Sequence, residues 1–129
     1  MIRYKGINHL AMVTTDMDST IRFWRDLLGM RLVAGLGDRK HRHYFLEISP
    51  TDLIAFFEWP DGEKIPIKDH GVPTKTPIAF DHVSIGVSDL SDLIALKRKL
   101  TANDKPISKL AQIFSGDSIS VRKRNKARK

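Results

Sequence analysis

The chain has 129 residues, of which 41% are hydrophobic and 29% charged, the proportions of one globular domain. It lacks cysteine, which excludes disulfides and thiolate metal ligands. It also lacks an apolar signal region after Met1, and no apolar run approaches the roughly 20 residues that cross a bilayer. We therefore expect a soluble cytoplasmic protein with no membrane contact. The net charge of +7 excludes little, because six of the 22 basic residues lie in the last eight positions and the rest is nearly neutral.

The first predicted elements are a strand and a helix. Residues 7–14 are apolar at both alternating sets of positions, which predicts a strand buried on both faces. Asp16 or Asp18 can cap a following helix. An apolar stripe at i, i+3 and i+7 marks one face of that helix, and Gly29 stands where a left-handed residue ends it. The stripe consists of Ile21, Trp24 and Leu28.

Three strands are expected next, at Met30–Ala34, His43–Ile48 and Leu53–Trp59. The run Ser-Pro-Thr-Asp at 49–52 predicts a turn between the last two. Residues 1–60 therefore form a first β-α-β-β-β module. Residues 61–79, rich in proline and glycine, are interpreted as a linker.

The pattern then begins again. A strand is expected over Phe80–Val87, a cap at Ser88 or Asp89, and a helix with a second apolar stripe. That stripe consists of Leu93, Leu96 and Leu100. Short strands are expected near 106–114 and 117–121, where the second module, 80–121, stops before its last strand. Residues 122–129 are a tail with six basic residues and no acid, expected to be disordered; without a basic face or aromatic support, we do not expect nucleic-acid binding.

Residues 7–27 and 80–100 align at a constant offset of 73 without a gap. Five of the 21 positions are identical, where about one is expected by chance. The identical pairs are His9 and His82, Asp16 and Asp89, Ile21 and Ile94, Arg25 and Arg98, and Leu27 and Leu100. The repeat suggests two similar modules that bring two imidazoles together.

Four motifs carry a resemblance to a known family. They are Ile-Asn-His-Leu-Ala-Met-Val at 7–13, Ile-Arg-Phe-Trp-Arg-Asp-Leu-Leu-Gly-Met at 21–30, Phe-Phe-Glu-Trp at 56–59 and Phe-Asp-His-Val at 80–83. In this order and spacing they resemble the vicinal oxygen chelate superfamily of glyoxalases, extradiol dioxygenases and bleomycin resistance proteins, over residues 6 to about 121. The resemblance implies an α+β fold in which two tandem βαβββ modules form a glyoxalase-like cleft, and it implies a homodimer.

Carried over residue by residue, the resemblance implies a metal site made of His9, Glu58 and His82. Two imidazoles and a carboxylate suit Fe, Mn, Ni or Zn and leave positions open for a substrate. Glu58 also follows an apolar run, where an unpaired charge would be costly and a metal ion would satisfy it. Phe56 and Trp59, beside Glu58, are the expected substrate-binding residues.

Each candidate has a structural alternative. A strand histidine is more often a hydrogen-bonded structural residue than a ligand, and Glu58 can simply mark the exposed end of a strand. His41 and His43 share a strand face, but the cationic side chains around them would repel a metal ion. We therefore interpret that segment as a solvated strand start, and His70 as a loop residue.

Three functions follow. The first is a glyoxalase/dioxygenase-type metal-dependent enzyme acting on a small substrate that chelates the metal through vicinal oxygens. The second is a metal-free binding or sequestering protein of the bleomycin-resistance type, whose cleft is lined by aromatic residues: Phe45, Phe56, Phe57 and Trp59. The third is an inactive family member. The sequence turns into the basic run where the family has a turn and a last strand with a glutamate, and a shifted reading frame or truncated gene would explain this.

Overall fold

The computed structural model describes residues 1–105 and 118–119. The chain divides into two compact units, Met1–Lys64 and Ile65–Lys129. Each is described by itself. Together they contain strands and a smaller number of helices in the described residues, so the predicted α+β class is confirmed.

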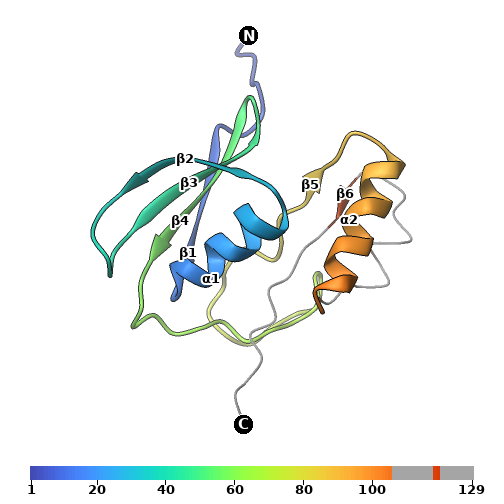
Figure 1. Ribbon diagram of the computed structural model, residues 1–129. Helices are drawn as coiled ribbons and strands as arrows, with labels where there is room; N and C mark the ends of the chain where they lie inside the picture. The colour runs from blue at the N-terminus through green and yellow to red at the C-terminus, as the bar shows by residue number, and fades with distance from the viewer. Residues whose placement is uncertain (106–117, 120–129) are drawn as a thin grey trace. The chain divides into compact units, whose positions relative to one another are not determined.

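The first unit is built on a four-stranded sheet in the order β1-β4-β3-β2 (Figure 1). The strands are β1 (His9–Thr14), β2 (Arg31–Leu36), β3 (His43–Ser49) and β4 (Asp52–Glu58). β1 pairs with β4 in parallel, whereas the other pairs are antiparallel. A parallel pair needs a long crossover, and here the helical segment and two further strands provide it. The β-α-β-β-β order predicted for this part of the chain is the one observed.

The crossover begins with helix α1 (Met17–Ile21) and continues as a π-helix, η1 (Arg22–Leu27). The Asp16 side chain accepts a hydrogen bond from the Ser19 N–H at 3.0 Å, which confirms one of the two predicted caps. Gly29 has a φ of +79°, as expected for the residue that ends the helical segment. The π-helical winding is not predicted by the sequence.

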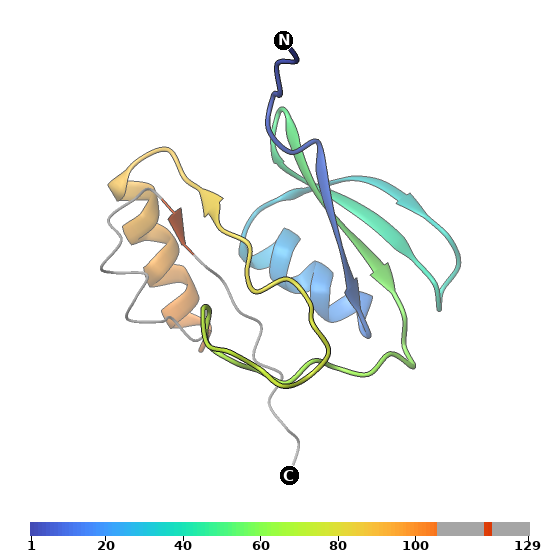
Figure 2. The same ribbon diagram turned by 180° about the vertical axis from the view of Figure 1, so that it is seen from behind.

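The core of the first unit lies between this helical segment and one face of the sheet, as Figures 1 and 2 show from opposite sides. The Trp24 ring packs 5.5 Å from Phe56 and 5.5 Å from Phe23, between ring centroids. The buried apolar side chains of this layer are Met17, Ile21, Phe23, Trp24, Leu46, Ile54 and Phe56. Removing such area from water is the main stabilising term of a unit this small.

The other face of the sheet is not covered by a helix of the first unit. Along β1, His9, Ala11 and Val13 are exposed, while the alternate residues are half-buried. The expectation that this strand is buried on both faces is therefore wrong. Ala11 and Val13 on the outer side of this strand are apolar although they are exposed.

The second unit contains helix α2 (Leu90–Ala102) and a short antiparallel pair, β5 (Ile85–Gly86) with β6 (Ser118–Ile119). Asp89 caps α2 by accepting the Asp92 N–H at 2.9 Å, as predicted, and Leu100 is buried. The strand expected over 80–87 is thus only two residues long. The strand expected at 106–114 and the tail at 122–129 lie outside the described residues.

None of the helices in the described parts of the chain has the length and apolar character that a membrane span requires.

Candidate functional site

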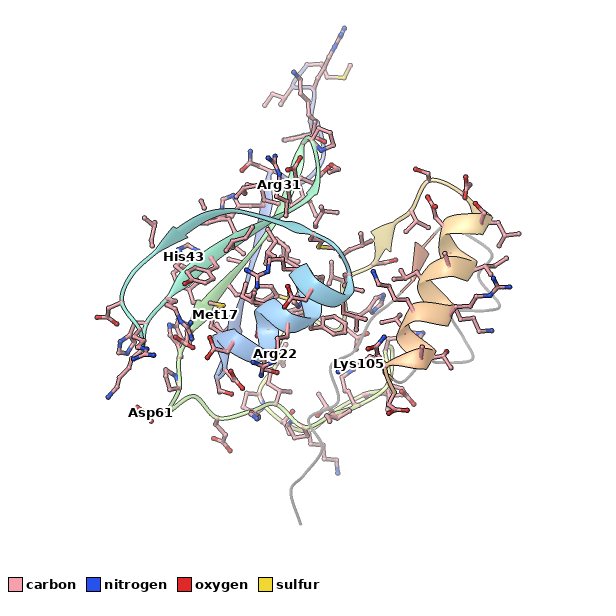
Figure 3. All side chains as sticks on the ribbon, viewed as in Figure 1. Met17, Arg22, Arg31, His43, Asp61 and Lys105 are labelled. Carbon is pink, nitrogen blue, oxygen red and sulfur yellow. The ribbon has the colours of Figure 1, made fainter. Side chains whose placement is uncertain are left out.

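A row of aromatic and imidazole rings runs across the face of the first sheet that no helix of the first unit covers, which we call the open face. Its members are the exposed-side residues of β1, β4 and β3, together with the residue that follows β4. Neighbouring strands place His43 opposite Phe57 and Phe45 opposite Ala55, so these side chains share one face. Figure 3 labels His43 on β3.

The rings of the open face contact one another in sequence. His43 stacks on Phe57 with ring centroids 3.6 Å apart and an interplanar angle of 18°. It also lies 4.5 Å from Phe45, which meets the edge of His9 at 6.0 Å. At the other end, Trp59 lies 6.2 Å from Phe57. The row therefore runs His9, Phe45, His43, Phe57, Trp59.

Three of these rings remain accessible: Phe57 is 37% exposed, Trp59 is 53% exposed, and His9 is exposed as well. In contrast to these accessible rings, His43 has a buried polar atom: its Nε2 has no hydrogen-bond partner among the residues that the structure describes. A buried polar atom without a partner is costly and calls for an explanation. The open face thus combines accessible aromatic surface with one unsatisfied polar group.

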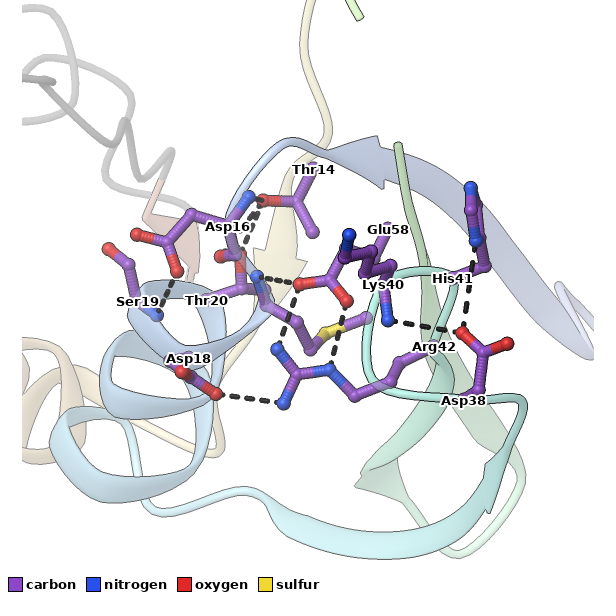
Figure 4. Close-up of polar contacts among 11 residues, drawn as sticks. Thr14, Asp16, Asp18, Ser19, Thr20, Asp38, Lys40, His41, Arg42 and Glu58 are labelled. Atoms are coloured by element: carbon purple, nitrogen blue, oxygen red, sulfur yellow. Dashed lines mark hydrogen bonds and ion pairs between the residues drawn. The ribbon is translucent and has the colours of Figure 1, made fainter. Parts of the chain in front are cut away.

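Glu58 lies on the opposite face of the same sheet, beneath the helical segment (Figure 4). Its carboxylate accepts two hydrogen bonds from Arg42, Nε to Oε1 at 2.9 Å and Nη2 to Oε2 at 2.8 Å. A third comes from the Met17 N–H, at 2.9 Å from Oε2. Hydrogen bonds from Arg42 lower the pKa of Glu58, burial opposes this, and the Met17 N–H lowers it further. The lowered pKa keeps the carboxylate ionised at neutral pH, and both of its oxygens accept hydrogen bonds from protein donors.

His9 and Glu58 are not brought together. The parallel register pairs His9 with Leu53 and Glu58 with Thr14, so the two residues stand at opposite ends of the β1–β4 pair. Five residues along a strand span about 16 Å, and the alternation places the two side chains on opposite faces. The set of His9, Glu58 and His82 therefore does not fit a metal ion through Glu58 as this unit is folded.

His82 belongs to the second unit, where its Nδ1 lies 2.7 Å from the Asp81 carboxylate. His9 has the same arrangement with its own preceding residue, since its Nδ1 lies 2.9 Å from Asn8 Oδ1. Both oxygens accept hydrogen bonds, so Nδ1 of each ring carries the proton and Nε2 holds a lone pair. The repeat thus extends to how the two imidazoles are oriented. Within either unit, no group of three or more His, Asp or Glu side chains in the described residues could hold a metal ion.

The remaining candidates divide between the two faces. Phe56, expected at the substrate, is buried against Trp24 on the helical side, whereas Trp59 lies on the open-face row. His43 is not part of a solvated strand start, because it is half-buried and stacked. Cationic neighbours in the sequence argue against His43 as a site residue, whereas its alternation with Phe45 is the available indication of the ring row.

The profile of the Glyoxalase/Bleomycin resistance protein/Dioxygenase superfamily matches residues 6–121. Among solved structures, the chain is similar to a glyoxylase/bleomycin resistance protein/dioxygenase domain from Frankia sp. EAN1pec, with 17% identity, a TM-score of 0.66 and coverage of 82% of this chain and 74% of that one. Lactoylglutathione lyase from Agrobacterium tumefaciens gives 17% identity, a TM-score of 0.56 and coverage of 81% and 75%.

The fosfomycin resistance protein FosX from Listeria monocytogenes, complexed with Mn(II) and a sulfate ion, gives 14% identity, a TM-score of 0.52 and coverage of 82% and 77%. At these identities the likeness shows the fold alone. No curated protein sequence matches the chain.

Proposed function

The chain belongs to the Glyoxalase/Bleomycin resistance protein/Dioxygenase superfamily, and we propose that it binds a small aromatic or apolar molecule on the open face without a metal ion. The row of five rings on that face carries the proposal. Small-molecule sites are lined mainly by aromatic and apolar side chains with a few placed polar groups. The Nε2 of His43, buried and unpaired in the structure, becomes such a polar group when the surrounding rings move apart around a ligand.

The donor chemistry of the first unit favours a site without metal. The Glu58 carboxylate makes three hydrogen bonds to Arg42 and Met17 and faces away from the row. A flat ligand gains instead from stacking on Phe57 and Trp59, whose rings are accessible. The ligand class expected is therefore planar and apolar, with one hydrogen-bonding group.

The two tryptophans of the chain allow a direct test, because Trp59 lies on the open face and Trp24 in the core. An anilinonaphthalene sulfonate probe is titrated in the presence of EDTA into the Trp24→Phe and Trp59→Phe variants. We expect saturable quenching of Trp59 emission with one probe per chain, and much weaker quenching of Trp24.

Phe57→Ala is expected to weaken probe binding at least about tenfold, since it removes an accessible ring that contacts both His43 and Trp59. Tyr4→Ala is the matched control, because it removes an aromatic ring that is 87% exposed and belongs to no ring contact of the row. Equal affinities of the Phe57→Ala and Tyr4→Ala variants would refute the proposal.

A metal-dependent enzyme of the glyoxalase or dioxygenase type is a second candidate, with Fe, Mn, Ni or Zn as the ion. It is favoured by one observation: Nδ1 of both His9 and His82 is held by the preceding residue, the arrangement that orients metal-binding imidazoles. Arg42 holds Glu58 on the face of the sheet opposite His9, so Glu58 is not assigned to such a site and no catalytic step is assigned to it.

Metal analysis of the wild type beside His9→Ala and the double variant His9→Ala, His82→Ala tests this candidate. A wild type that retains no divalent ion more tightly than the double variant rules it out. An inactive family member, the third possibility, is expected to fail both the metal and the probe experiments. The homodimer implied by the resemblance remains a proposal, which light scattering tests.

A further inference from the structure

We propose that His70 and His82 form a binding site for a zinc-class divalent ion, contained entirely in the second unit. The two rings lie side by side, tilted at an interplanar angle of 57°, with centroids 5.3 Å apart. Nothing in the sequence marks His70 as a ligand, since it lies in the segment interpreted as a linker.

The separation of the rings matches the geometry of a shared ion. With Zn–N bonds of about 2.0–2.1 Å and tetrahedral angles, two imidazoles on one ion have ring centroids roughly 5 Å apart. Imidazole nitrogen suits Zn, Cu, Ni and Fe rather than Mg or Ca. Water molecules would complete the coordination of a site that has two protein ligands.

Asp81 prepares His82 for this role. Its carboxylate accepts the Nδ1–H of His82 at 2.7 Å, which fixes the tautomer and leaves the Nε2 lone pair for an ion. A carboxylate behind a metal-binding histidine is the common way to orient the ring and strengthen it as a ligand.

The same carboxylate holds the loop that carries His70. Asp81 accepts the Gly71 N–H at 2.7 Å and pairs with the ammonium group of Lys68. Gly71 has a φ of +72°, a conformation that other residues adopt only with strain, so the chain turns directly after His70. The loop is thereby fixed with its imidazole beside His82.

The local charge permits a cation. An unpaired Lys68 ammonium group would repel a cation, but this group is paired with the Asp81 carboxylate. Both imidazoles are within reach of solvent, because His82 is exposed and His70 half-buried. The site needs neither His9 nor Glu58, which distinguishes it from the metal set implied by the family resemblance.

Calorimetric titration of ZnCl₂ into the full chain at pH 7.5 tests the site. We expect one ion per chain, and an affinity lowered at least about tenfold by His70→Ala or His82→Ala. His41→Ala is the matched control, because it removes an exposed histidine of the first unit that belongs to neither proposed site, and it should bind zinc within about twofold of the wild type.

A second measurement needs no variant: zinc should shift the ring-nitrogen NMR signals of His70 and His82 together. The proposal is overturned if the wild type binds no zinc, if His70→Ala binds it like the wild type, or if the His70 signals do not move. None of these outcomes affects the proposed ligand on the open face, because that experiment is performed with EDTA present.

Discussion

Arg42 donates two hydrogen bonds, of 2.9 and 2.8 Å, to the Glu58 carboxylate. The third nitrogen of its guanidinium donates to Asp18 at 2.8 Å. The pair joins the residue before β3 to the end of β4, and the Met17 N–H fastens the start of α1 to the same carboxylate. A carboxylate held in this way closes one end of the helical layer. We therefore interpret Glu58 as a structural residue of the first unit.

Arg42→Ala is expected to destabilise the first unit by about 3 kcal/mol, because it leaves a carboxylate that is only 5% exposed without its partner. Urea denaturation followed by circular dichroism measures the loss. Arg31→Ala is the control, because it breaks the ion pair between Arg31 and Glu47. The Arg31 side chain is 77% exposed, so this variant should lose less than about 1 kcal/mol of stability. Equal losses for the two variants would contradict a structural role for Glu58.

Stability should fall in acid partly through Glu58. Its pKa in the folded state lies below the ordinary value of 4.5, chiefly because Arg42 donates to it. A depressed carboxyl pKa adds stability that is fully present above about pH 4.5 and is lost as the pH falls through the folded-state pKa. Glu58→Gln is therefore less stable than the wild type at pH 7, and the difference should narrow toward pH 3. Thermal melting across this range checks it; a constant difference would refute the assignment.

The two matching caps should contribute similarly. Asp16 accepts the Ser19 N–H and Asp89 accepts the Asp92 N–H, at equivalent positions of the repeat. Replacement of either by Ala should cost about 1 kcal/mol, whereas Asn, which also caps, should cost much less. Chemical denaturation measures Asp16, and amide exchange over α2 measures Asp89. If Asn and Ala are equally destabilising, the charge rather than the hydrogen bond is responsible.

Gly29→Ala isolates the cost of a left-handed backbone. Gly29 has a φ of +79°, and a Cβ built there meets no atom within 4 Å, so crowding makes no contribution. We expect a loss of about 1–2 kcal/mol in the free energy of unfolding, and a smaller one for Gly29→Asn. A neutral Gly29→Ala variant would mean that the backbone relaxes after the helix.

Features that depend on a few neighbouring residues could be predicted from the sequence. Asp16 and Gly29 mark the limits of the first helical segment because capping and left-handed turns involve residues within about four positions. The strands of the first unit were likewise predicted to within two residues. The strand expected over 80–87 is limited to Ile85–Gly86, and Asp81 binds the Gly71 N–H with its side chain, a contact that hydropathy does not reveal.

The assignment of faces could not be predicted, because residues 53–57 are apolar on both sides of the strand. Glu58 pairs in register with Thr14, which is 44 positions away, and no local pattern contains that register. The cationic neighbours of His43 in the sequence led to the wrong prediction of a solvated strand start for a related reason. Arg42 and His43 alternate, so the arginine turns toward Glu58 while the histidine stacks on Phe57.

Phe56 and Phe57 offer the sharpest test of these two faces, because adjacent residues of one type have opposite surroundings. Phe56 is 5% exposed and packs on Trp24, so Phe56→Ala should cost about 3–5 kcal/mol of stability. Phe57 is 37% exposed on the open face, so Phe57→Ala should cost clearly less. Urea denaturation gives both values. Probe binding is then measured without urea, at a temperature where both variants are folded, and should be lost only in Phe57→Ala. Loss only in Phe56→Ala would place the ligand on the helical side instead.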